Sequence, residues 1–171
     1  GCSPYLKALA EQEGDWLREA LAGSPEAALQ ATLDSLGPAA PEATATALRR
    51  AKRRVALLAG LADLGGVWPL EDVTAALTDL ADRATHRALA TALAEEIRRG
   101  KLPGAKPGDE ETGAGMVALA MGKMGAHELN YSSDIDLICL FDESRFSPDD
   151  YHDARAAFIR ATRKAAALLS H

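Results

Sequence analysis

Up to residue 99, apolar residues recur with the three-to-four-residue spacing of amphipathic helices. Ala, Leu, Arg and Glu dominate residues 41–64 and 69–99, and glycines follow both segments, as expected where a helix ends. Ser-Pro occurs at 3–4, 24–25 and 147–148, and it favours a helix start because Ser caps backbone N–H groups and Pro fits the first turn. The pattern predicts a helical bundle over residues 1–99 and another helix over 148–169.

The pattern changes after residue 115. Residues 116–121 and 135–141 are short apolar runs separated by a polar turn, and they are too short for independent helices, so we predict two strands. The preceding segment, 100–115, is rich in Gly and Pro and poor in large apolar side chains, which indicates a linker or mobile loop. The expected fold class is α+β, with residues 116–171 as the start of a second, incomplete domain.

The charge of the chain narrows the range of partners. Lys and Arg number 19 against 25 Asp and Glu, a net charge of −6, which disfavours binding to nucleic acid or to an anionic membrane. The basic run at 49–54 lies opposite apolar positions, so we interpret it as a solvated helix face. No apolar run approaches the ~20 residues that span a bilayer. Cys2 and Cys139 suggest no disulfide framework, and we expect a cytoplasmic protein.

Two aspartates open the second predicted strand. Because side chains alternate along a strand, Asp134 and Asp136 should share one face with Cα atoms about 6–7 Å apart. Two like charges there favour a compensating cation, and carboxylate oxygens suit Mg²⁺, or Mn²⁺, whose shell phosphate oxygens would complete. A bare Asp-x-Asp is equally compatible with two solvated aspartates where a loop becomes a strand.

A glycine-containing loop follows the first predicted strand directly. Gly122 and Gly125 let backbone N–H groups approach a phosphate, and Lys123 adds a positive charge. Residues 124–133 are enough to return the chain alongside the first strand, which would place this loop beside the aspartates. Ser133 is suited to a phosphate hydrogen bond or to a turn. A P-loop does not fit, because Met124 stands where that motif needs Ser or Thr.

A strand, a glycine loop and Asp-x-Asp at the start of the next strand resemble the polymerase-beta-like nucleotidyltransferases. Residues 122–125 and 128–138 more closely resemble the motif of the glutamine synthetase adenylyltransferase / adenylyl-removing enzyme family, and residues 55–68 are similar to it as well. The sequence from Asn130 to Asp136 is more similar to the adenylyl-removing domain of this family than to its adenylylating domain. The family usually carries Gly-Gly-Arg where this chain has Gly125-Ala126-His127.

The resemblance implies an enzyme that removes AMP from a tyrosine of glutamine synthetase by metal-dependent phosphorolysis, yielding ADP, and that adds AMP from ATP through another domain. Its implied partners are glutamine synthetase and the PII signal protein. It makes Asp134 and Asp136 the catalytic metal ligands. The implied phosphate or nucleotide contacts are Gly122, Lys123, Gly125 and Ser133.

The resemblance also implies a third carboxylate on a later strand, beyond the helix that ends this chain. We therefore expect the metal site within residues 116–171 to be incomplete, and the chain alone to be inactive. The alternative is a non-catalytic helical module that binds a protein partner and carries a vestigial metal site.

Overall fold

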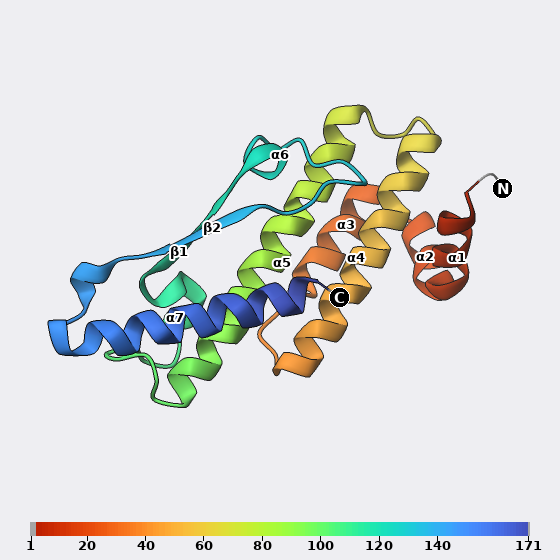
Figure 1. The fold of residues 1–171 in the computed structure, drawn as a ribbon. Helices are drawn as coiled ribbons and strands as arrows, with labels where there is room; N and C mark the ends of the chain where they lie inside the picture. The colour runs from red at the N-terminus through yellow and green to blue at the C-terminus, as the bar shows by residue number, and fades with distance from the viewer. Residues whose placement is uncertain (1–2, 171) are drawn as a thin grey trace.

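The computed structural model describes residues 3–170, so Cys2 lies outside the described part, and its fold is α+β as expected (Figure 1). The helical part comprises α1 (Pro4–Gln12), α2 (Gly14–Leu21), α3 (Pro25–Asp34), α4 (Pro41–Leu64) and α5 (Leu70–Arg98). The remainder comprises the 3-10 helix η1 (Asp109–Gly115), β1 (Met116–Ala120), α6 (Gly122–Gly125), β2 (Leu137–Phe141), η2 (Glu143–Arg145) and α7 (Pro148–Leu169). Within residues 3–170, no helix is both long and apolar enough to cross a membrane.

The helix starts that Ser-Pro predicts are confirmed. The side chains of Ser3, Ser24 and Ser147 each accept a hydrogen bond from the backbone N–H three residues later, at the N-termini of α1, α3 and α7. The bounds of α4 and α7 are those expected, and α5 begins and ends one residue inside the predicted segment. Serine caps therefore define the starts of α1, α3 and α7, whereas α2, α4, α5 and α6 begin without a side-chain cap.

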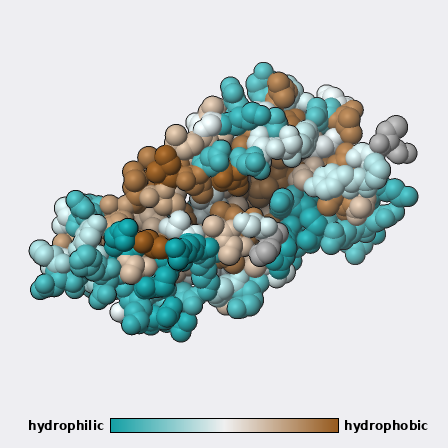
Figure 2. All heavy atoms as spheres, in the orientation of Figure 1, coloured by the Kyte–Doolittle hydropathy of each residue, from teal (hydrophilic) through white to brown (hydrophobic). Residues whose placement is uncertain are grey.

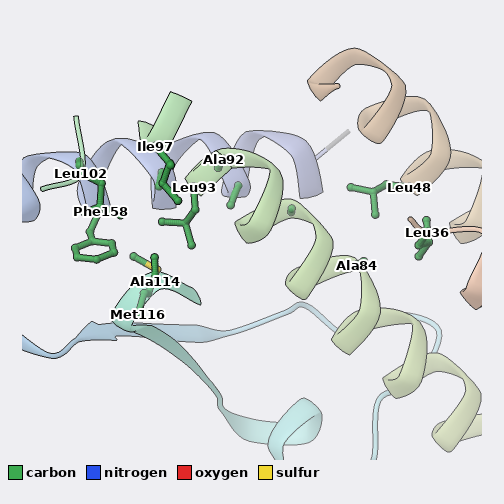
Figure 3. Packing of buried hydrophobic residues seen from close by; sticks show 14 of the residues in the cluster. Leu36, Leu48, Ala84, Ala92, Leu93, Ile97, Leu102, Ala114, Met116 and Phe158 are labelled. Atoms are coloured by element: carbon green, nitrogen blue, oxygen red, sulfur yellow. The ribbon is translucent and has the colours of Figure 1, made fainter. Parts of the chain in front are cut away.

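The main hydrophobic core forms around α5, which packs against both α4 and α7, and in Figure 1 α7 crosses in front of α5. Ala88 and Ala92 of α5 are almost fully buried, and their small side chains let α7 approach closely. In Figure 3 the side chains of Leu93 of α5 and Phe158 of α7 extend from their helices toward Met116, the first residue of β1. The helices and the start of the sheet thus share one core.

The two strands form an antiparallel pair in which Met116 lies opposite Phe141 and Ala120 opposite Leu137. The expected start of the second strand at residue 135 is wrong, because β2 begins at Leu137. β1 ends at Ala120, and the chain then turns into α6, so residues 134 and 135 have no strand to pair with. The two aspartates therefore precede the strand.

The basic run at 49–54 is not simply a solvated face. Arg53 and Arg54 donate hydrogen bonds of 2.7 and 3.0 Å to the two carboxylate oxygens of Glu13, which is buried at the junction of α1 and α2. Burial raises the pKa of Glu13, but the bonds from Arg54 and Arg53 outweigh it and hold that pKa below its usual range. Two of the basic residues thus attach the first helices to α4.

The segment 100–115, expected as a linker or mobile loop, contains η1 and packs on α5. Leu102 and Ala114 are buried in the main core. Arg87, only 8% exposed on α5, donates hydrogen bonds of 2.9 and 2.8 Å to the two oxygens of Glu111. These contacts with residues distant in the sequence order the segment, although its composition favours a mobile loop. The boundaries 1–99, 100–115 and 116–171 stay a prediction, and the core is continuous across them.

The Arg87–Glu111 pair makes a testable contribution to stability. The hydrogen bond from Arg87 lowers the pKa of Glu111 despite partial burial, so the stabilisation is present above the ordinary pKa of Glu and is lost as pH falls through the lowered value. Glu111→Gln should reduce the free energy of unfolding by about 1 kcal/mol at pH 7, a value kept low because Glu111 is partly exposed. Urea unfolding should show this difference shrinking below about pH 4.

The matched control is Glu19→Gln, at an exposed glutamate of α2 for which the described residues provide no ion pair. It should leave the unfolding midpoint nearly unchanged at both pH values. An equal loss of stability at pH 7 and below pH 4 for Glu111→Gln would show that the charged pair is not the source of the effect.

Candidate phosphate and metal site

The glycine loop is a single helical turn at the end of β1. Gly122 has a φ of +56°, a left-handed conformation that glycine adopts without strain. A side chain at Gly125 would overlap the carbonyl oxygen of Ala120, because this turn folds directly back on the end of the strand. Met124 of the same turn is buried in a cluster with Ala81 of α5. The backbone thus requires glycine at 125 and favours it at 122, whatever the loop binds.

The chain returns from α6 through a loop, residues 126–136, that touches the helical bundle. Leu129 is buried with Met124, and its backbone N–H donates a 3.4 Å hydrogen bond to the hydroxyl of Thr78 on α5. The hydroxyl of Tyr131 donates a 3.1 Å hydrogen bond to the Asp63 carboxylate near the end of α4. The bundle therefore sets the position of this loop.

Residues 130–133 form a tight turn that is held together by hydrogen bonds to the side chain of Asn130. Its Oδ1 accepts hydrogen bonds from the Ser132 N–H and from the hydroxyls of Ser132 and Ser133. The Ser133 hydroxyl also accepts the Asn130 N–H at 3.0 Å. The structure thus gives Ser133 the turn role that the sequence left open, while its phosphate contact stays a prediction.

Asp134 and Asp136 follow this turn, and both are exposed. The Met121 N–H donates a 2.9 Å hydrogen bond to the backbone oxygen of Asp136, so Asp136 continues the antiparallel pairing by one residue. By strand alternation, Asp136 shares the outward face with Ile138 and Leu140, which are both exposed. The backbone of Asp136 thus lies next to the start of the glycine loop, as the sequence predicts. Asp134 lies in the loop before the sheet and lines a cavity together with Leu137 and Cys139, so the strand alternation from which a shared face was expected does not extend to it.

Positive charge at the site comes from the glycine loop itself. Lys123 is exposed on α6, and among residues 3–170 it has no ion-pair partner. Ala126, which departs from the family pattern, has a φ of −89° and needs no glycine there. His127 has a φ of +57°. Its charge acts on Asp82 of α5, whose pKa is raised mainly by burial, with His127 acting in the opposite sense.

A cavity of about 530 Å³ lies between the loop, β2 and α7. Ser133 and Asp134 contribute to its wall, and most of the rest is aliphatic. A neighbouring cavity of about 360 Å³ shares Ser133 and extends between the loop, α4 and α5. The segment that carries the aspartates thus stands over open space and is not backed by a filled core.

The outer face of the sheet is apolar. The exposed side chains there are Val117, Leu119, Ile138 and Leu140, which form directly opposed pairs across the two strands. Brown spheres gather over this part of the molecule in Figure 2. An exposed aliphatic face was not predicted, because strand periodicity alone cannot tell which face of a sheet is covered.

The structure brings the glycine loop and Asp136 together at one end of the sheet, whereas Ser133 and Asp134 lie in the preceding turn and loop, against the cavity beside α7. Within residues 3–170, no three His, Cys, Asp or Glu side chains gather as a metal site. Asp134 and Asp136 supply two oxygen ligands of the kind that Mg²⁺ and Mn²⁺ prefer. Thr78 and Asp63, which hold the loop, could not be found from the sequence, because no local pattern connects them with it.

A sequence model of the family described as glutamate-ammonia ligase adenylyltransferase matches residues 1–171. The chain therefore belongs to the glutamate-ammonia ligase adenylyltransferase family, a family of nucleotidyl-transferring enzymes. No solved structure matches the chain.

Curated relatives support the same assignment. The chain is 43% identical over 98% of its length to the bifunctional glutamine synthetase adenylyltransferase/adenylyl-removing enzyme of a Bradyrhizobium strain. It is 41% identical to that of Rhodopseudomonas palustris over 98% of its length, and 40% identical to that of Caulobacter vibrioides over 92%. The matches cover 18%, 17% and 16% of those relatives, so the chain spans less than a fifth of their length.

The tight turn at Gly125 predicts a position that tolerates no side chain. Gly125→Ala should destabilise the protein by roughly 1–3 kcal/mol, because the overlap is with backbone and can be relieved only by moving the turn away from β1. Gly37→Ala is the matched control, since an added methyl group there meets nothing within 4 Å. Thermal unfolding should separate the two variants. Equal midpoints would contradict the close approach of α6 to β1.

Proposed function

We propose that this chain is part of an enzyme that removes AMP from adenylylated glutamine synthetase by metal-dependent phosphorolysis. The observation that carries the proposal is the junction of the glycine loop with the Asp134–Asp136 segment at one end of the sheet, joined by the Met121–Asp136 hydrogen bond. Membership of the family and the names of the relatives support the substrate protein. The sequence from Asn130 to Asp136 supports the removing reaction over the adding one.

The proposed reaction forms a bond between a phosphate oxygen and the phosphorus of AMP while the bond from that phosphorus to the tyrosine oxygen breaks. The proton of hydrogen phosphate ends on the tyrosine oxygen, and ADP is released. A bound Mg²⁺ or Mn²⁺ would neutralise phosphate charge. Asp134 and Asp136 would hold the metal, while Lys123 and the backbone N–H groups between Gly122 and Gly125 would orient the phosphates.

This assignment gives the other parts of the chain a supporting role. The helical bundle holds the loop through Thr78 and Asp63, and the open outer face of the sheet leaves Asp136 accessible from solvent. The proposed partners are glutamine synthetase and the PII signal protein, and the proposed small ligands are phosphate, ADP and ATP. A cytoplasmic location fits these ligands.

Metal binding is the first test. Mn²⁺ should bind weakly to the 171-residue chain and broaden the NMR amide signals of residues 133–137, because two carboxylates without further ligands hold a divalent ion loosely. Asp136→Asn should abolish the broadening and leave the fold intact, whereas Asp149→Asn, at an exposed aspartate of α7, should leave it unchanged. Equal broadening in wild type and Asp136→Asn would show that the metal site is assigned wrongly.

Activity is tested in a chimera in which residues 1–171 replace the matching segment of the Bradyrhizobium enzyme. We expect phosphate-dependent release of ADP from adenylylated glutamine synthetase. Asp136→Asn in the chimera should reduce it by more than about 100-fold, because even outer-sphere partners of metal ligands change activity 10–100-fold.

The same chimera contains its own control, since the relatives are named as bifunctional. Asp136→Asn should leave the addition of AMP from ATP unchanged, which shows that the chimera is folded. Loss of AMP addition with AMP removal intact would show that the chain belongs to the adenylylating half. Unchanged rates for both reactions would favour the alternative of a binding module with a vestigial site.

A further inference from the structure

The loop that carries Asp134 and Asp136 is attached to the helical bundle by a side chain that has no role in the proposed chemistry. Tyr131 lies at the tip of the 130–133 turn, and its hydroxyl donates a hydrogen bond to Asp63, which is 68 residues earlier in the chain. The other attachment is the Leu129 N–H to the Thr78 hydroxyl, on the side of the turn away from the aspartates. Tyr131 is thus the attachment nearer to Asp134.

The turn transmits this attachment to the aspartates because it is internally rigid. Asn130 and Ser133 exchange hydrogen bonds through their side chains and backbone, with distances from 2.8 to 3.1 Å. Tyr131 is the second residue of this closed turn, and Asp134 is the first residue after it. A displacement of the Tyr131 ring therefore moves the turn, and Asp134 with it.

The surroundings give Asp134 few other supports. The cavity of about 530 Å³ lies directly against Ser133 and Asp134, so packed side chains do not fix the loop from below. After the turn, the next backbone hydrogen bond among the described residues is that of Met121 to Asp136. Asp134 is accordingly held between the Tyr131 attachment on one side and the sheet on the other.

The electrostatics of the pair favour a persistent bond. Partial burial, the hydrogen bond to Asp63 and the charge of Asp63 raise the pKa of Tyr131 to about 12, although the residue is 54% exposed. The phenol thus stays protonated as a donor throughout the neutral range. Asp63 lies in the last turn of α4, where a negative charge opposes the helix dipole, so the helix itself gains nothing from a carboxylate there.

We propose that Tyr131, held by Asp63, is a positioning residue that sets the separation of the Asp134 and Asp136 carboxylates for a divalent cation. This inference rests on the proposed metal site and adds that the helical bundle, through one phenol, determines how well the site binds. Tyr131 does not touch the metal or the phosphate. It acts through the turn.

The experiment compares Mn²⁺ dissociation constants, obtained from titrations of the amide broadening at residues 133–137, for variants of the 171-residue chain. Tyr131→Phe removes only the hydroxyl, and Asp63→Ala removes only the acceptor. Each should weaken Mn²⁺ binding roughly tenfold, as the loss of an outer-sphere contact does at other metal sites. Asp63→Asn keeps an oxygen acceptor for the phenol and should bind within about twofold of wild type.

Two comparisons separate positioning from stability. Tyr151→Phe removes a phenol hydroxyl on α7 and should leave Mn²⁺ binding unchanged. The double variant Tyr131→Phe/Asp63→Ala should bind no more weakly than either single variant, because both remove the same bond. Titrations well below each unfolding midpoint ensure that a loss of stability alone does not change the affinity of folded molecules.

The outcomes distinguish this inference from the proposed function. Wild-type affinity in both Tyr131→Phe and Asp63→Ala, with binding still abolished by Asp136→Asn, would overturn the positioning role and keep the metal site. Weakening in Asp63→Asn equal to that in Asp63→Ala would also overturn it, because the charge of Asp63 would then be responsible and not the hydrogen bond. A wild-type chain that does not bind Mn²⁺ at all would overturn both.

Discussion

The close packing of small residues along α5 is the interaction on which the rest of the structure depends. Val73 and Ala76 contribute to the cluster beneath the first helices, Ala81 to the cluster under the glycine loop, and Ala88 and Ala92 to the main core. Alanine at four of these five positions costs little side-chain entropy and allows neighbouring backbones to approach. One helix thereby connects the bundle, the sheet and the site loop, which lie far apart in the sequence.

Most of the helical fold could be predicted from the sequence because its signals are local. Ser-Pro and the glycines that follow each periodic segment define helix ends through bonds within three or four residues. The start of β2 could not be predicted in the same way. Whether residues 134 and 135 belong to a strand depends on where β1 ends, and the apolar pattern of one strand does not contain that information.

The candidate site shows the same division. Gly122 and Gly125 could be identified because their absence of a side chain is visible in the sequence, and the structure gives a backbone reason for each. The supports of the loop could not. Thr78 and Asp63 are separated from their partners by 51 and 68 residues, and each has an ordinary helical neighbourhood in the sequence. The order of segment 100–115 could not be predicted from its composition either. It comes from contacts with distant residues, which include the salt bridge between Glu111 and Arg87.

The exposed aliphatic face has a consequence for how the protein behaves at high concentration. β1 and β2 are short, uncharged and free of proline, which are the properties of segments that form intermolecular sheets. Asp134 and Asp136 directly precede β2, where charges act as gatekeepers against such assembly. The carboxylates that we propose as metal ligands would therefore also help to keep the protein from aggregating, so that one substitution at either position would affect both properties.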